Sequence, residues 1–143
     1  MNILLINGSP KGPASNSLKL ASAFVDGMRD ARPDAELRAL EVRSLDIAPC
    51  KGCFACWSKT PGTCCMHDGM AQVLEDQRWA DVTIWSFPLY YFGIPGPLKN
   101  LMDRQLPTSL PFMADRTDGV GNGAHPSRVD RSGKRTVVVS TCG

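Results

Sequence analysis

Short apolar runs alternate along the chain with segments of helical hydrophobic spacing. Residues 3–6 form a continuous apolar run that ends in a turn of Asn, Gly, Ser and Pro, as expected for a strand buried on both faces of a parallel sheet. The pattern predicts further strands at residues 35–42, where burial should alternate, at 81–87 and at 136–139. The sequence therefore predicts four strands.

Helices are predicted between these strands. Apolar residues recur at helical spacing from residue 16 to about residue 28, with Ser15 as the N-cap and Pro33 beyond the end. A second helix follows Asp68, which is interpreted as its N-cap, and a third begins at Pro97. Because strands and helices alternate, we expect an α/β fold, a doubly wound parallel sheet with helices on both faces.

Length and charge narrow the classes of function. The 143 residues suit one domain, and 16 Lys+Arg against 14 Asp+Glu leave a net charge of +2. This balance gives no electrostatic support for a nucleic-acid or membrane partner. The apolar stretch 82–98 is interrupted by Pro and Gly and predicts no transmembrane helix. Since the N-terminus has no basic leader, we expect a cytoplasmic protein whose six cysteines are thiols or ligands before they are disulfides.

The loop after the first strand is suited to an anion. It runs straight into a helix N-terminus, where free N–H groups and the helix dipole favour a phosphate. Neither a Gly-x-Gly-x-x-Gly fingerprint nor a P-loop occurs there, and an ordinary turn with a serine N-cap is the alternative. The candidate phosphate-binding side chains are those of Ser9, Lys11, Ser15, Asn16 and Ser17.

The loop after the third strand holds three consecutive aromatic residues, 90–92, flanked by Gly and Pro. Such a loop could wall a flat ring, or its aromatics could pack in the core or at a subunit contact. Ligands of doubly wound sheets bind beyond the carboxyl ends of the strands, here between the first and third strands. The two loops together favour a nucleotide with one phosphate and a large planar head, and FMN fits this description better than NAD or ATP.

Residues 43–67 form a cysteine-rich loop, and residues 105–133 show no hydrophobic period and are expected to form a mobile loop. The compact C-x2-C-x2-C-x7-C spacing suits a [4Fe–4S] cluster, whereas zinc more often uses two separated pairs. Reduced cysteines in a surface loop, or a labile disulfide between near neighbours, are the alternatives. The candidate cluster ligands are Cys50, Cys53, Cys56 and Cys64.

Several segments together resemble the NADPH-dependent FMN reductase family, a flavodoxin-like group that includes iron–sulfur flavoproteins and WrbA-type quinone reductases. The resemblance covers residues 2–143 and is carried by Gly8-Ser9-Pro10-Lys11 with Ser15-Asn16-Ser17, by Pro88-Leu89-Tyr90-Tyr91, and by Gly96-Pro97-Leu98-Lys99 with Asp103-Arg104. Family members usually continue into a further helix and a fifth strand. The resemblance therefore implies a single flavodoxin-like FMN-binding domain, 1–143, that lacks the usual fifth strand and is truncated at its C-terminus.

The resemblance also implies roles for individual residues. The loop 9–17 would hold the FMN phosphate, and in the iron–sulfur branch the cysteines would bind a cluster close to the flavin. The residues that would line the isoalloxazine are Pro88, Leu89, Tyr90, Tyr91, Phe92 and Gly93. A third flavin loop would begin with Thr141, Cys142 and Gly143.

These observations favour an FMN-dependent oxidoreductase that takes electrons from NAD(P)H and passes them to a quinone, a nitro or azo compound, or a flavin. No catalytic side chain is expected, because the cofactor performs the redox chemistry. The first alternative is an iron–sulfur flavoprotein that carries electrons to a ferredoxin-like partner. The second is a truncated, non-catalytic fragment. The family resemblance implies a homo-oligomer, a dimer or a tetramer.

Overall fold

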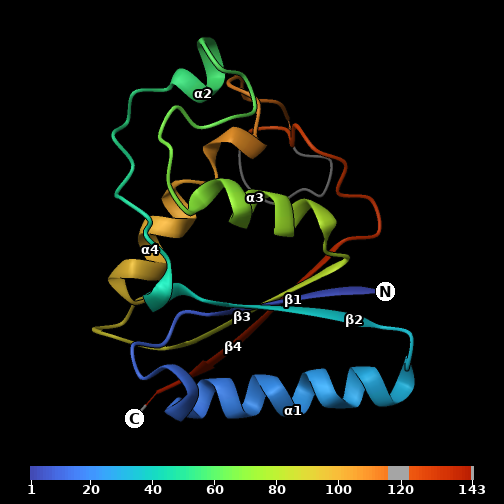
Figure 1. The fold of residues 1–143 in the computed structure, drawn as a ribbon. Coiled ribbons are helices and arrows are strands. Elements are labelled where there is room, and N and C mark those ends of the chain that lie inside the picture. The colour runs from blue at the N-terminus through green and yellow to red at the C-terminus, as the bar shows by residue number, and fades with distance from the viewer. Residues whose placement is uncertain (116–122, 143) are drawn as a thin grey trace.

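The computed structural model describes residues 1–115 and 123–142, and within them four parallel strands form one sheet in the order β2-β1-β3-β4 (Figure 1). The predicted doubly wound parallel sheet is confirmed. Since β1 pairs with both β2 and β3, the strand order reverses direction beside it. The strands are β1 (Asn2–Asn7), β2 (Glu36–Glu41), β3 (Val82–Pro88) and β4 (Arg135–Thr141).

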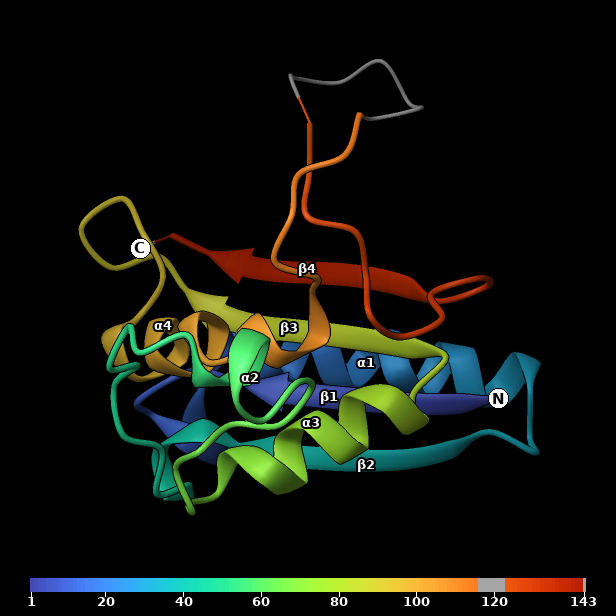
Figure 2. The same cartoon turned by 90° about the horizontal axis from the view of Figure 1, so that it is seen from above.

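Helices cover both faces of the sheet, as predicted. Helix α1 (Asn16–Ala31) lies on one face, and α3 (Met70–Trp79) and α4 (Gly96–Asp103) lie on the other (Figures 1 and 2). The apolar side chains of β1 alternate between these layers: Ile3 packs in the core against α1, and Leu4 in the core against α3 and α4. Residues 3–6 are therefore buried on both sides, as the continuous apolar run predicted.

The expected alternation of burial in the second strand is wrong. The first four residues of β2 are exposed and the last two are only partly buried. The reason is its position at the edge of the sheet, where no strand covers one side. Arg38 of this strand reaches across to α3, where its guanidinium lies 4.0 Å from the centre of the Trp79 ring and 2.7 Å from the carboxylate of Asp76.

The carboxylate of Asp68 lies at the start of α3, although the helix begins at Met70, one residue later than an N-cap at this position would place it. Its Oδ1 accepts the N–H of Met70 at 3.1 Å, and its Oδ2 accepts the N–H of Ala48 at 3.2 Å. Gly69 lies between Asp68 and Met70, and a Cβ at this position would lie 3.1 Å from the carbonyl oxygen of Asp46. Asp68 therefore supports the helix start and also ties it to the preceding loop.

Both predicted loops contain short regular structure. The cysteine-rich loop includes the single-turn helix α2 (Ala55–Ser58), and the segment 105–133 includes a 3-10 turn, Leu106–Thr108. Isolated antiparallel bridges join Ser109 to Ser127 and Ala114 to Ala124. The centre of that segment, 116–122, lies outside the described residues. Of the helices that are described, none combines the length and the apolar character needed to span a membrane.

Candidate functional site at the carboxyl edge of the sheet

Three chain segments meet beyond the carboxyl ends of the central strands. The N–H of Gly8, after β1, donates to the carbonyl of Ser86 in β3 at 2.8 Å. The N–H of Leu89, after β3, donates to the carbonyl of Thr141 at the end of β4 at 2.9 Å. The hydroxyls of Ser17 and Thr141 lie 2.7 Å apart, which joins the start of α1 to β4. The structure therefore brings together residues from all three predicted flavin loops.

Buried polar groups hold the loop after β1 in shape. The amide of Asn7 is buried, donates to both carboxylate oxygens of Glu41 at 2.9 and 3.0 Å, and accepts the N–H of Ser9 at 3.1 Å. Gly8 lies so close to α4 that a Cβ would come within 2.6 Å of the Leu98 side chain. The sequence pattern did not indicate a role for Asn7, because its partner Glu41 belongs to a different strand.

The predicted phosphate-binding side chains separate into two groups. Ser9, Ser15 and Ser17 are buried, whereas Lys11 and Asn16 are exposed. The hydroxyl of Ser15 accepts the N–H of Leu18 at 3.3 Å, which confirms Ser15 as the N-cap of α1. The first N–H groups of a helix have no acceptor within it.

A hollow of about 380 Å³ lies against this loop. Arg43 contributes a cation to it, 3.9 Å from the carboxylate of Glu41. Sequence reasoning missed Arg43, since a lone arginine after an edge strand carries no recognisable motif. The hollow is lined by Gly8, Pro10, Arg43, Ser44 and Pro97.

The aromatic loop forms a two-residue hairpin turn. Tyr90 and Gly93 exchange both backbone hydrogen bonds, at 2.9 and 3.0 Å, and the two residues between them have positive φ angles of 48° and 62°. A turn of this kind favours Asn-Gly, so bulky residues in it carry backbone strain. Tyr91 and Phe92 are 98% and 97% exposed. They do not pack in the core of this chain, so the alternative of core packing is wrong for these two residues.

Five cysteines surround one small cavity, of about 20 Å³, at the cysteine-rich loop. The four predicted ligands come together there, with Cys65 in addition. Cys56 is buried and Cys64 partly so, while the other three thiols are exposed. Burial raises the pKa of Cys56. The thiol donors suit a cluster, although within the described residues no group of three His, Cys, Asp or Glu is arranged to hold a metal ion.

A buried ion pair lies beneath the cysteine-rich loop. Arg104, only 1% exposed, binds the carboxylate of Asp68 through two hydrogen bonds of 2.7 and 2.9 Å and donates to the carbonyl of Ala48 at 2.8 Å. The guanidinium of Arg104 lowers the pKa of Asp68. Asp68 and then Cys64 raise the pKa of Arg104. The pair thus connects α4, the start of α3 and the cysteines.

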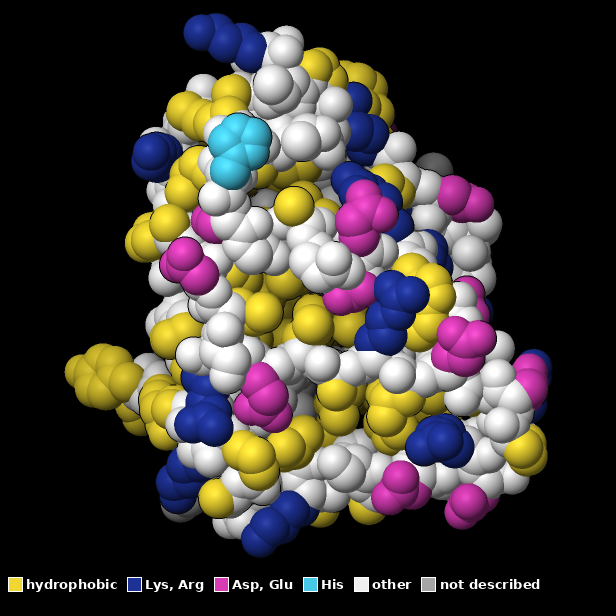
Figure 3. All heavy atoms as spheres, viewed as in Figure 1, with side chains coloured by type: hydrophobic (Ala, Val, Ile, Leu, Met, Phe, Trp, Pro, Cys, Tyr) yellow, Lys and Arg dark blue, Asp and Glu magenta, His cyan; other side chains and the backbone are white. Residues whose placement is uncertain are grey.

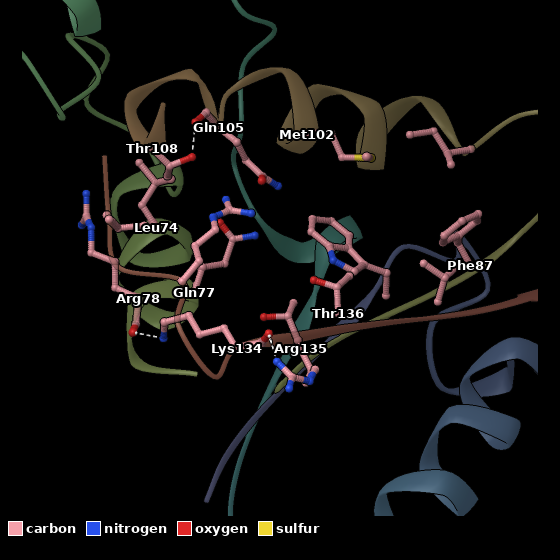
Figure 4. Close-up of a pocket in the computed structure, with 16 residues that line it drawn as sticks. Leu74, Gln77, Arg78, Phe87, Met102, Gln105, Thr108, Lys134, Arg135 and Thr136 are labelled. Atoms are coloured by element: carbon pink, nitrogen blue, oxygen red, sulfur yellow. Dashed lines mark hydrogen bonds between the residues drawn. The ribbon is translucent and has the colours of Figure 1, made fainter. Parts of the chain in front are cut away.

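A second hollow, of about 340 Å³, lies between β3, β4, α3 and α4 (Figure 4). Apolar side chains such as Trp85 and Val138 line it, together with basic residues near the start of β4. Lys134 is held in place there, because its amino group donates to the carbonyls of Arg78 and Ala80 at 2.8 and 2.6 Å. This hollow contains none of the predicted site residues.

Charges of both signs share the face of the molecule that Figure 3 shows. On the face shown in Figure 3, basic and acidic side chains are interspersed and neither sign dominates, in keeping with the net charge of +2. An extended basic stripe, the usual footprint of nucleic-acid binding, is not visible on this face.

The chain is similar in sequence to known flavoproteins. An iron–sulfur flavoprotein of Archaeoglobus fulgidus is 34% identical over 104 residues, 73% of this chain and 48% of that relative. FMN-dependent NAD(P)H:quinone oxidoreductase 1 of Pseudomonas aeruginosa is 27% identical over 150 residues, 99% of this chain and 68% of the relative. The chain spans about half the length of the iron–sulfur flavoproteins that it matches.

The fold itself has solved counterparts. An azoreductase from Bacillus anthracis superposes with a TM-score of 0.70 at 15% identity, covering 100% of this chain and 69% of that one, a likeness that concerns the fold alone. A family model described as flavodoxin-like fold matches residues 1–143. Its match over the whole sequence, together with the strand order and the loops at the carboxyl edge, shows that the chain belongs to the flavodoxin-like fold family.

Proposed function

We propose that this chain binds FMN at the carboxyl edge of its sheet and acts as an oxidoreductase that takes electrons from NAD(P)H. The electron acceptor would be a quinone, a nitro or azo compound, or a flavin. The observation that carries the proposal is the meeting of the three loops, above all the 2.7 Å contact between Ser17 and Thr141. A relative named FMN-dependent NAD(P)H:quinone oxidoreductase supports the same activity.

The residues at this edge would bind and orient the cofactor. When bound, FMN supplies the hydride and electron transfer, so the protein needs no catalytic acid or base. The start of α1 and the cations Lys11 and Arg43 would offset the charge of the phosphate. The remaining phosphate contacts would come from Ser9, Ser15, Asn16 and Ser17.

The strained hairpin turn would present its aromatic side chains to the planar ring. Residues 88–93 would line the isoalloxazine, and the carbonyl of Thr141 already fixes the start of this loop through Leu89. Thr141 and Cys142 would begin the third flavin loop, and Gly143, which lies outside the described residues, would continue it. These residues would hold the ring at the carboxyl edge of the sheet, and the redox chemistry would be that of the cofactor.

Removal of the exposed phosphate-binding groups is expected to weaken FMN binding. In the double variant Lys11→Met/Asn16→Leu, the Kd should rise about 10- to 100-fold, because two polar contacts of about 1 kcal/mol or more are lost. Both side chains are exposed, so the fold should survive. Titration of the apo-protein, followed by quenching of FMN fluorescence, measures the effect.

Lys19→Met is the matched control, since Lys19 is an exposed cation further along the same helix, and its Kd should stay close to wild type. An unchanged Kd in the double variant would contradict the assigned phosphate site. A wild-type protein that is colourless after FMN is added and the sample is desalted would contradict FMN binding itself. That result would favour the alternative of a non-catalytic fragment.

A second candidate function is that of an iron–sulfur flavoprotein that carries electrons to a ferredoxin-like partner. It is favoured by the five cysteines that line one cavity and by relatives named iron-sulfur flavoproteins. Anaerobic reconstitution with iron and sulfide is expected to give about four irons per chain, the content of a [4Fe–4S] cluster. In the variant Cys56→Ser, the reconstituted protein should contain no cluster iron. Absence of iron in the reconstituted wild type would dismiss this function.

We further propose that residues 1–143 work as one flavin-binding domain in a cytoplasmic homo-oligomer, a dimer or a tetramer. The exposed aromatic residues Tyr91 and Phe92 provide apolar surface that a second copy would cover. Their position beside the carboxyl edge would place the flavin near the subunit contact. The exposed outer strand β4 offers a further surface for association.

A further inference from the structure

Two exposed cysteines of the cysteine-rich loop lie in direct contact. The sulfur atoms of Cys53 and Cys65 are 3.6 Å apart, and both side chains are exposed to solvent. Cys53 lies just before α2, and Cys65 lies twelve residues later, before α3. The spacing of the predicted cluster ligands includes Cys53 but not Cys65, so the cluster motif does not account for this contact.

The other cysteines at the cavity are placed differently. Cys56 is buried within α2, and the partly buried Cys64 lies against Arg104. Solvent access and close approach of two sulfurs are what thiol–disulfide exchange requires. Among the described cysteines, Cys53 and Cys65 combine a sulfur–sulfur contact with side chains that are both exposed.

We propose that Cys53 and Cys65 form a reversible disulfide, so that the cysteine-rich loop is a dithiol redox site. A disulfide bond is about 2.0 Å long, so the two sulfurs need to approach by about 1.6 Å. Gly52, directly before Cys53, has a positive φ of 62° and no atom within 4 Å of its missing Cβ position, which gives the backbone room to adjust.

The oxidant is a low-molecular-mass disulfide such as oxidised glutathione. One protein thiolate attacks a sulfur of this reagent, forms a mixed disulfide and releases one reduced thiol. The second protein thiolate then attacks the first protein sulfur, forms the Cys53–Cys65 bond and releases the other reduced thiol. The protein loses two electrons and two protons, and the reagent gains both.

The bond has a consequence for the predicted cluster. Cys53 is one of its four candidate ligands, and a sulfur in a disulfide is no longer available as a thiolate. The cluster and the disulfide are therefore mutually exclusive states of the same loop. The disulfide does not depend on FMN binding or on the proposed oxidoreductase activity, and it can be tested in the flavin-free chain.

The test uses the full chain, freed of iron with a chelator, fully reduced and then incubated with oxidised glutathione. Iodoacetamide then blocks the remaining thiols, and mass spectrometry counts them. The wild type is expected to lose two alkylatable thiols without gaining glutathione. After trypsin digestion, the peptide 52–59 should be linked to the peptide 60–78, and fragmentation should assign the bond to Cys53 and Cys65.

Serine variants separate this pair from the neighbouring thiols. Cys65→Ser should give no linked peptide and carry glutathione on Cys53, whereas the control Cys64→Ser should form the link as the wild type does. Both side chains replaced lie outside the buried core, and circular dichroism checks that each variant is folded. A link that persists in Cys65→Ser, a fragment that places the bond at Cys56 or Cys64, or a wild type with only glutathione adducts would overturn the proposal.

Discussion

Replacement of Arg104 by Met is expected to lower the free energy of unfolding by about 3–5 kcal/mol, because it leaves the carboxylate of Asp68 buried without its partner. The guanidinium also satisfies the carbonyl of Ala48, which loses its donor in the variant. Urea denaturation at pH 7 measures the change. A loss of this size is a large fraction of the stability of an ordinary domain.

Two further variants test whether the unpaired buried charge causes the loss of stability in Arg104→Met. The double variant Asp68→Asn/Arg104→Met should recover about half of the loss, since it leaves no unpaired charge in the interior. Lys99→Met removes an exposed ion pair with Asp103 on the same helix and should cost less than about 1 kcal/mol. Equal losses for Lys99→Met and Arg104→Met would contradict the role given to the buried pair.

The same pair gives stability a dependence on acid pH. Arg104 lowers the pKa of Asp68 in the folded state. The contribution of this ion pair to the free energy of unfolding is therefore fully present above the ordinary carboxyl pKa near 3.8. The contribution is lost as the pH falls from there through the lower pKa of the folded protein. The unfolding free energy of the wild type should therefore decline more steeply between pH 4 and pH 2 than that of Arg104→Met.

Replacement of Ile84 by Ala is the second change with a large expected effect. Ile84 is fully buried in β3, where it belongs to the core between the sheet and α1 that also contains Ile3 and Val25. Removal of its side chain should lower the unfolding free energy by about 2–5 kcal/mol, since the packed surroundings cannot close the cavity. Urea denaturation again provides the measurement.

Val138→Ala is the matched control for Ile84→Ala. Val138 lies in the adjacent strand but is 60% exposed, so its truncation should cost less than about 1 kcal/mol. Similar losses at the two positions would contradict the role given to Ile84 in the buried core.

The sequence predicted most of the fold because local patterns control it. The apolar run at residues 3–6 is typical of a strand buried on both faces, and Ser15 and Pro97 marked helix starts through their own backbone preferences. The alternation of strands and helices then led to a parallel sheet with loops collected at one edge. The error at β2 arose because an edge position depends on the strand order, which hydrophobic periodicity does not contain.

At the candidate site, too, some features follow from local sequence and others depend on the tertiary structure. The sequence by itself determined which loops follow the central strands and which of their residues have phosphate-binding or aromatic chemistry. Only the tertiary structure decided that Ser17 meets Thr141, that Asn7 is held by Glu41, that Arg104 pairs with Asp68, and that Cys53 touches Cys65 rather than a nearer cysteine. These contacts join residues that are 12 to 124 positions apart. They form because separate elements pack against one another, and no local sequence pattern encodes that packing.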